Sequence, residues 1–339
     1  MSQLNVDAIR ASNGTGDAIS FTASSNTCTA NITNNLSNRN LIINGAMQVW
    51  QRGTSTTTSS DYQADRFWVV NQGTYARDNS APDGFQYSAK LTHSSSDMAI
   101  GTPLELPATG NAAPLVATNK FTVSFYGKAD SGTEDVNLLC RYRNSKFSGT
   151  NQVDFTGTGQ TFTLTTSWQR FTKTFTIPTV NANNTIISIE VEGIGATAYF
   201  TGFQAELGEY ATDFEHRSYA DELRRCKRYY QQYPEKPTAD NYTTLVSSCV
   251  ACHSTQEGYW AVDFRPSLRN PPSFSHTGNF RANGSGVASV GLTTMGIYHN
   301  GTSSTFMYAR ASSGFVAGVP VIISTNNDNT AFIKFDAEL

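Results

Sequence analysis

Aromatic side chains with polar neighbours are the residues of this sequence best suited to chemistry, and the chemistry they suit is sugar binding. An aromatic ring offers an apolar face that stacks on the C–H surface of a sugar, while nearby polar groups bond its hydroxyls. Burial statistics indicate that about two thirds of such rings lie in a core or an interface. The candidates for glycan contact are Trp50, Tyr62, Trp68, Tyr126, Tyr142, Tyr259, Trp260, Tyr298 and Tyr308.

Motifs for catalysis or for a cofactor occur only in weak form. The sequence CVACH at residues 249–253 has the haem-attachment spacing, but it continues a strand pattern where haem attachment favours a helix. Haem attachment also requires export, and the sequence shows no export signal. The sequence GIG at residues 193–195 is followed by a strand instead of the helix that a dinucleotide needs. Glu190 and Glu192 could act as paired carboxylates in glycan hydrolysis, although such pairs on surface strands are mostly inert. We therefore expect no catalytic residue, no cofactor and no enzymatic activity.

The composition favours sheets and excludes two classes of partner. Of the 339 residues, 15% are charged and 12% are aromatic, and Thr, Phe and Tyr suit half-buried strands. The net charge of -3 gives no basic face for nucleic acid. The longest apolar stretch, Phe315 to Ile323, is interrupted by Gly and Pro and is far shorter than the roughly 20 residues of a membrane span. We expect neither nucleic-acid binding nor membrane insertion.

The N-terminus and the cysteines indicate synthesis in a cytoplasm. The first 16 residues, MSQLNVDAIRASNGTG, lack the basic and apolar regions of a signal peptide. The five cysteines are an odd number, which favours reduced thiols over a disulfide framework.

Strand and turn patterns divide the chain into four parts. Residues 1–40 are rich in Asn, Thr and Ser and predict a short extended stem, ordered only against a partner, or a disordered leader. Residues 41–214 hold many short alternating strands between Gly and Asn turns, which is typical of a jelly-roll sandwich. Residues 215–236 predict a linker helix, and residues 237–339 a second β-sandwich. The predicted fold class is thus all-β with one helix.

The predicted helix spans residues 215–232 and ends before Pro234. Steps of three and four residues place one set of side chains on a single seam. The seam could pack on the chain's own β domains or meet copies of the chain on a threefold axis. The seam residues are His216, Tyr219, Leu223, Cys226 and Tyr230. A basic cluster on the same segment, from Arg217 to Arg228, is typical of a solvated face.

Several phrases resemble the tail fibres of tailed bacteriophages. The junction AYFTGFQAELGEYATDFEHRSYADELRRCKRYY, at residues 198–230, is similar to the one that follows a jelly-roll module in those fibres. LNVDAIR and GTGDAISF resemble the N-terminal segment of marine-phage fibres, and VDFRPSLRNPPSF and FDAEL resemble their C-terminal domain, with Leu268 in place of the usual Met. KFTVSFYGKAD, SWQRFTKTFTIP and FQAELG are similar to jelly-roll carbohydrate-binding modules.

The resemblance implies a receptor-binding protein in the virion tail, made in the host cytoplasm. It implies a homotrimer that attaches to tail or baseplate proteins through residues 1–40 and to a host-surface polysaccharide through its β domains. It also implies a structural calcium, for which Gln204 and Glu206 are weak candidates. Two alternatives stay open: a purely structural virion component without glycan binding, such as a capsid-decorating fibre or baseplate spacer, and a glycan depolymerase. Depolymerising tail spikes usually carry a long β-helix, and no such repeat is visible in the sequence.

Overall fold

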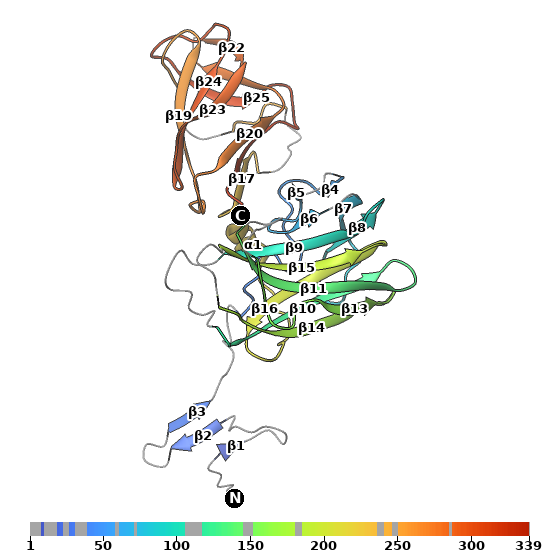
Figure 1. The fold of residues 1–339 in the computed structure, drawn as a ribbon. Coiled ribbons are helices and arrows are strands. Elements are labelled where there is room, and N and C mark those ends of the chain that lie inside the picture. The colour runs from blue at the N-terminus through green and yellow to red at the C-terminus, as the bar shows by residue number, and fades with distance from the viewer. Residues whose placement is uncertain are drawn as a thin grey trace, which may run out of the picture.

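Antiparallel sheets and one short helix make up the part of the chain that the structure describes. The computed structural model describes residues 8–9, 19–22, 27–30, 39–57, 61–70, 73–105, 117–144, 152–179, 185–235, 241–245, 250–284 and 287–338. The predicted all-β fold class is confirmed in these residues. The described residues hold two hydrophobic cores, one in a jelly-roll sandwich and one in a C-terminal domain. The two β domains are seen as separate bodies in Figure 1. No helix in the described part of the chain is long and apolar enough to cross a membrane.

Two sheets form the jelly roll. Sheet 1 has the strand order β14 (Gln169–Thr176), β10 (Lys120–Ala129), β16 (Ala198–Leu207), β8 (Ser88–His93), β7 (Gly73–Asp78) and β4 (Ser55–Thr56). Sheet 2 has the order β12 (Val153–Asp154), β11 (Glu134–Arg143), β15 (Ile186–Ile194), β9 (Met98–Glu105), β6 (Trp68–Val70) and β5 (Asp61–Tyr62), with β13 (Gln160–Leu164) also paired to β11.

Alternation along the strands decides which face of sheet 2 is apolar. In β11, Leu138 and Cys140 point into the core, whereas Asn137 and Arg141 point away from it. This is the period-2 pattern of a strand with one buried face. The outward face of sheet 2 therefore carries charged and amide groups over its central strands.

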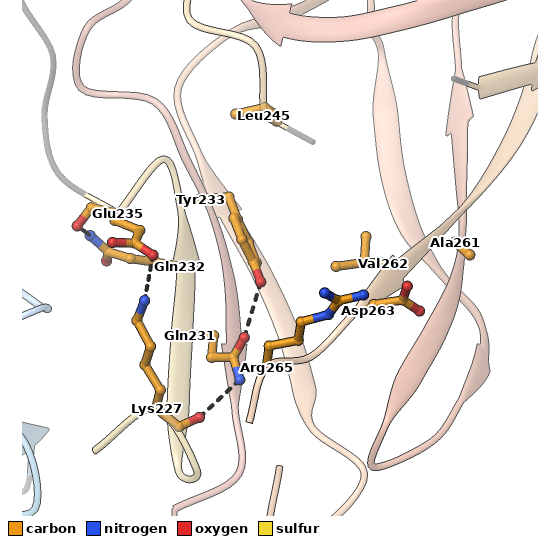
Figure 2. Close-up of a pocket in the computed structure, with 10 residues that line it drawn as sticks. All are labelled: Lys227, Gln231, Gln232, Tyr233, Glu235, Leu245, Ala261, Val262, Asp263 and Arg265. Atoms are coloured by element: carbon orange, nitrogen blue, oxygen red, sulfur yellow. Dashed lines mark hydrogen bonds and ion pairs between the residues drawn. The ribbon is translucent and has the colours of Figure 1, made fainter. Parts of the chain in front are cut away.

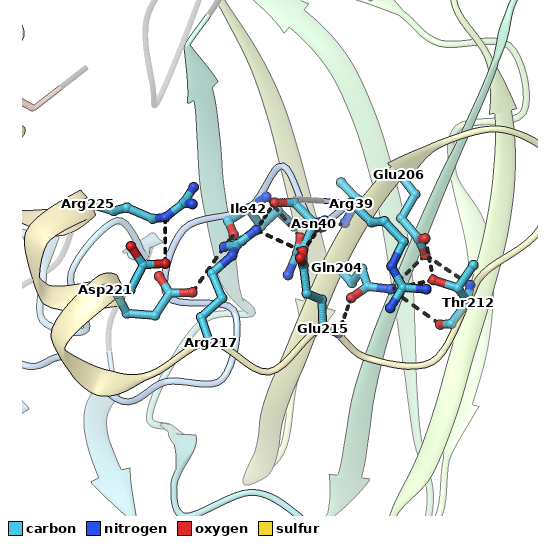
Figure 3. A network of polar contacts seen from close by, with 12 residues as sticks. Arg39, Asn40, Ile42, Gln204, Glu206, Thr212, Glu215, Arg217, Asp221 and Arg225 are labelled. Atoms are coloured by element: carbon cyan, nitrogen blue, oxygen red, sulfur yellow. Dashed lines mark hydrogen bonds and ion pairs between the residues drawn. The ribbon is translucent and has the colours of Figure 1, made fainter. Parts of the chain in front are cut away.

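A polar strap, residues 208–218, leaves β16 and crosses the outer face of sheet 1 (Figure 3). Glu206 accepts the backbone N–H of Thr212 at 3.0 Å, and Gln204 accepts the N–H of Glu215 at 2.8 Å. Arg217 bonds the carbonyl of Ile42 at 3.1 Å, so the strap is fixed to the start of the jelly roll as well. These contacts give a segment without regular structure a fixed path.

The helix is shorter than the sequence predicts. α1 spans Tyr219–Cys226, eight residues, and it begins where Ser218 caps the N–H of Asp221 at 3.2 Å. Residues 230–233 are not helical but form strand β17 (Tyr230–Tyr233), which pairs with β26 (Phe332–Asp336) near the C-terminus. Main-chain pairing with a distant strand therefore ends the helix before the predicted position.

The single seam predicted for the helix is consequently wrong. Cys226 and Tyr230 are buried, but Tyr219 is 47% exposed and Leu223 is only partly buried. His216 lies on the strap, where its ring is 4.9 Å from that of Phe85. The five residues thus belong to the strap, the helix and a strand, and they face different surroundings.

Two further sheets enclose the core of the C-terminal domain. Sheet 3 has the order β17, β26 and β20 (Ser273–Thr277). Sheet 4 has the order β22 (Val287–Gly291), β21 (Phe280–Gly284), β25 (Pro320–Thr325), β18 (Val250–Cys252), β19 (Glu257–Asp263), β24 (Ser304–Arg310) and β23 (Thr294–Asn300). In the predicted stem, β1 (Ala8–Ile9), β2 (Ile19–Thr22) and β3 (Thr27–Ala30) form a small antiparallel sheet.

The described thiols are consistent with a reduced chain. Cys140, Cys226 and Cys252 are buried free cysteines, and burial raises the pKa of each thiol. Cys252 lies in β18, so the CVACH sequence has a strand context instead of a helical one. Cys249 lies outside the described residues.

Candidate glycan-binding cleft

Four of the nine predicted aromatic residues have no face available to a ligand. Trp50 and Tyr142 belong to the jelly-roll core, and Trp260 belongs to the core of the C-terminal domain. Tyr62 is 1% exposed and lies under the guanidinium of Arg52, at 5.3 Å. These four side chains stabilise the fold, and the structure removes them from the candidate set.

Trp68 lies on the outward face of sheet 2. It pairs with Gly101 in β9, and a Cβ atom added at Gly101 would lie 2.3 Å from Cζ2 of the indole. The indole therefore rests directly on the glycine backbone, a close approach that a side chain at position 101 would prevent. Only 1% of Trp68 is exposed, so this ring forms part of a wall and not a free stacking surface.

A cleft of about 420 Å³ opens beside Trp68 on sheet 2. Its polar lining comes from three places: Asn137 and Arg143 on β11, Glu190 and Glu192 on β15, and Asp97 just before β9. This volume is in the range of small-ligand sites, and the lining offers both hydrogen-bond donors and acceptors.

Ion pairs fix the polar groups of the cleft. Arg143 binds Glu190 at two points, with Nε–Oε1 at 2.9 Å and Nη2–Oε2 at 3.0 Å. Nη1 of Arg141 lies 3.8 Å from Glu190 and 3.9 Å from Glu192. Burial raises the pKa of Glu190 to about 7, and its hydrogen bond with Glu192 acts in the same direction, whereas Ser188 and both arginines lower it.

This arrangement suits binding better than hydrolysis. A retaining glycosidase holds its two carboxyl groups about 5 Å apart on either side of the scissile bond, and an inverting one holds them further apart. Glu190 and Glu192 instead lie two residues apart on the one strand β15, and Arg143 binds both oxygens of Glu190. Glu190 is therefore held as part of a fixed polar wall and not as one of two carboxylates on either side of a scissile bond.

Sequence reasoning anticipated the two carboxylates but missed the arginines. Arg141 and Arg143 alternate with the core residues Cys140 and Tyr142. The signal that could have found them is the alternation itself: β11 carries arginines at every second residue, and β15 carries glutamates at every second residue. Such a pair of strands indicates a charged outward face on the sheet.

The predicted calcium ligands hold the strap instead. Glu206 accepts hydrogen bonds from Gln204 at 2.7 Å and from the hydroxyl of Thr212 at 2.5 Å (Figure 3). Oε1 of Gln204 accepts a hydrogen bond from the N–H of Glu215. Among the residues that the structure describes, no group of three or more His, Cys, Asp or Glu side chains could hold a metal ion.

Tyr126 lies on sheet 1, away from the cleft. Its ring is 5.3 Å from that of Phe85, which in turn packs at 4.8 Å on Phe214 of the strap. The role supported by these contacts is to hold the strap, so Tyr126 does not join the other candidates.

The remaining three candidates come together on the C-terminal domain. Tyr259 and Tyr308 are paired across β19 and β24, and Tyr298 on β23 lies 5.7 Å from Tyr259. Phe306 joins them and was not among the predicted residues, although the alternation of β24 places it on the same face as Tyr308.

A second cleft, of about 490 Å³, lies between β17 and β19 (Figure 2). Its amides are already in use: Gln231 donates to the carbonyls of Lys227 and Pro266 and accepts the hydroxyl of Tyr233 at 3.0 Å. Lys227 pairs with Glu235 across the same cleft. These contacts connect the helix to the C-terminal domain, and the cleft contains none of the predicted sugar-contact residues.

One family model matches part of the jelly roll. Residues 109–197, which include β10, β11 and β15, match a family model described as a carbohydrate binding domain. No curated protein sequence matches the chain.

Solved structures with a similar fold include a CBM4 module, with 18% identity over 48% of this chain and 97% of that one, at a TM-score of 0.32. The CBM22-1 xylan-binding domain of Paenibacillus barcinonensis Xyn10C has 12% identity over 51% of this chain and 96% of that one, at 0.33. The enzymatically active domain of tailspike protein 4 of bacteriophage CBA120 has 13% identity over 50% of this chain and 21% of that one, also at 0.33. These identities and TM-scores are too low to carry any information on ligands. The comparisons therefore show a resemblance of residues 109–197 to a carbohydrate binding domain.

Proposed function

We propose that this chain binds a glycan in the cleft on the outward face of sheet 2. The observation that carries the proposal is the fixed set of donors and acceptors around Glu190, which lies on strands within the stretch that matches a carbohydrate binding domain. Sugar hydroxyls need such convergent polar groups, and groups already held in place lose little entropy on binding.

Asn137 and Glu192 form the accessible part of this set. The side chain of Glu192 is 39% exposed, and the amide of Asn137 accepts the hydroxyl of Thr161 at 2.7 Å. Both can approach a ligand without breaking the buried pair of Arg143 and Glu190.

We further propose that the chain is a bacteriophage tail fibre that attaches the virion to a host-surface polysaccharide. The support is the sequence resemblance of residues 198–230, of the N-terminal phrases and of the C-terminal phrases. In this proposal residues 1–40 attach to tail or baseplate proteins, and the fibre is a homotrimer. Three weak sites on one body would bind a repeating polymer through avidity.

The test is an array of bacterial-surface polysaccharides probed with the full chain and with an Asn137→Ala/Glu192→Gln double variant. We expect about tenfold weaker binding for the variant, because two hydroxyl contacts are lost. Glu209→Gln is the matched control, since Glu209 is exposed beyond the far end of β16. Light scattering on the same protein should give three times the chain mass of 36.9 kDa.

Equal binding by the double variant and the wild type would contradict the cleft proposal. A monomeric mass would contradict the homotrimer and leave the cleft proposal to be decided by the array.

A further inference from the structure

An aromatic surface covers part of sheet 4 in the C-terminal domain. We define the aromatic platform as Tyr259 on β19, Phe306 and Tyr308 on β24, and Tyr298 on β23. These three strands are neighbours in the sheet (Figure 1). The alternate residues of β19 and β24 face the core, so the platform rings point outward.

The platform rings are ordered with respect to one another. The planes of Tyr259 and Phe306 are 11° apart with centroids at 5.6 Å. Tyr298 meets both of them edge-on, at 5.7 and 6.1 Å. Tyr298 is 58% exposed and Phe306 is 38% exposed, so an organised aromatic surface faces solvent.

Small residues beside the rings keep the platform open. Tyr308 is opposite Gly296, and a Cβ atom there would lie 2.6 Å from the tyrosine hydroxyl. Ala251 pairs with Tyr259 on one side, and Ala261 pairs with Phe306. Accordingly, no bulky aliphatic side chain on β19, β24 or β23 shares this face, because their aliphatic residues point into the core.

The charges next to the platform neutralise each other. Arg310 donates to Glu257 at 2.8 Å and lies 4.9 Å above the ring of Tyr308. Glu257 also hydrogen-bonds Tyr259. One positive and one negative group thus hold two platform rings. Two imidazoles also border the platform: His253 lies 5.8 Å from Tyr259, and His299 stacks on Phe306 at 6.3 Å.

The size of the platform fits a sugar better than a second copy of the chain. Three adjacent strands span about 10 Å, since neighbouring strands lie about 4.8 Å apart. A stable protein interface buries about 800 Å² on each partner and involves about 20–30 residues a side. Four rings bordered by alanine, glycine, two histidines and a charged pair are too few for such an interface, but they match the faces of one or two sugar rings.

We propose that the aromatic platform is a second glycan-contact surface, which stacks on an uncharged sugar unit. Tyr298 and Phe306 supply the exposed ring faces, and the Glu257–Arg310 pair supplies polar groups at the edge for hydroxyls. The proposal does not depend on the cleft of sheet 2, because the two surfaces lie in different domains.

The test is saturation-transfer NMR on the full chain with neutral hexasaccharides of glucose, mannose and galactose, and with a galacturonate hexasaccharide as the charged comparison. We expect transfer to at least one neutral hexasaccharide, and about tenfold weaker binding in a Tyr298→Ala/Phe306→Ala variant. Tyr242→Ala is the matched control, since Tyr242 is 44% exposed in the same domain but stacks with Arg281 at 4.1 Å. The cleft variant Asn137→Ala/Glu192→Gln should keep this binding.

Three results would overturn the proposal. One is the absence of transfer to any neutral hexasaccharide, and another is binding that only the cleft variant weakens. The third is a lower mass of the platform variant in light scattering without any sugar binding, which would assign the platform to contacts between copies. Loss of binding in the platform variant alone would support the platform, and the polysaccharide array would decide the cleft separately.

Discussion

Glu190 shows two opposing effects on one carboxyl group. Arg143 binds both of its oxygens, which favours the charged form, but its side chain is only 2% exposed, and burial favours the neutral form. Burial is the larger effect, and it raises the pKa from 4.5 to about 7. Because the folded-state pKa is the higher one, the folded state binds more protons between these values.

The expected pH dependence follows from this sign. The stability that Glu190 contributes is fully present below pH 4.5 and is lost as the pH rises to about 7. The free energy of unfolding of wild type minus that of Glu190→Gln should therefore fall across this range, by at most about 3 kcal/mol. Urea unfolding at several pH values between 4.5 and 8 would measure it.

The direction of this change shows whether burial or the arginines have the larger effect on the pKa of Glu190. A difference that increases with pH would mean that the arginines outweigh burial and that the folded-state pKa lies below 4.5. Glu209→Gln should show no such trend, since Glu209 is exposed.

Residue types alone predict the candidate site only in part. Tyr259 and Trp260 are neighbours in one strand, so one of them must face the core and the other must face solvent. The sequence does not say which, because both rings suit either face. The structure places Trp260 in the core and Tyr259 on the platform. The buried arginines of the cleft were missed for a related reason: their partner Glu190 lies on another strand, and pairing between strands is not local.

At the scale of elements, local sequence patterns predicted secondary structure, but the pairing of strands that are distant in the sequence could not be predicted from them. Alternating strands and Gly turns predicted the all-β fold class, but the helix was expected from residue 215, and its cap at Ser218 was not predicted. The predicted end of the helix was wrong because β17 pairs with β26, about a hundred residues away. Tyr229 and Tyr230 continue the helical spacing, but they are buried beneath Arg66 and Arg52 at 3.6 and 3.8 Å.

The basic cluster of the junction divides into structural and solvated arginines. The side chain of Arg217 is 5% exposed and pairs with Glu215 and Glu222, both at 3.1 Å. The predicted solvated face therefore does not include Arg217. The side chain of Arg225 is 34% exposed, and its pair with Asp221 at 3.2 Å is the usual pair of a helix surface.

Arginine-to-alanine substitutions should separate these two roles. Arg217→Ala leaves Glu222 buried without its cation, and we expect it to lower the free energy of unfolding by about 3–5 kcal/mol. Arg225→Ala should cost less than about 1 kcal/mol, because exposed pairs contribute little. Urea unfolding of both variants would compare them, and similar costs would contradict the structural role of Arg217.

At the scale of the molecule, the C-terminus connects the two large domains. The carboxylate of Glu338, 3% exposed, pairs with Arg66 and lies 3.3 Å from Nη2 of Arg52. Both arginines belong to the jelly roll, and their guanidinium groups stack on Tyr229 and Tyr230. Asp65 also pairs with Arg52, at 3.3 Å. The cleft and the aromatic platform are thereby carried on domains that are tied together, which is what the two proposed glycan contacts would need in order to act jointly.

Glu338→Ala should loosen this connection without touching either surface. Removal of one partner from a buried ion pair costs about 3–5 kcal/mol, because the remaining charge stays buried. We expect calorimetry to show unfolding at a lower temperature, with separate transitions for the jelly roll and the C-terminal domain. Glu235→Ala is the control, because Glu235 also forms an ion pair, with Lys227, but its side chain is 57% exposed. If both variants unfold alike, the jelly roll and the C-terminal domain are held by apolar contacts and by the stacking of Arg52 and Arg66 on Tyr230 and Tyr229, and the carboxylate of Glu338 adds specificity without adding stability.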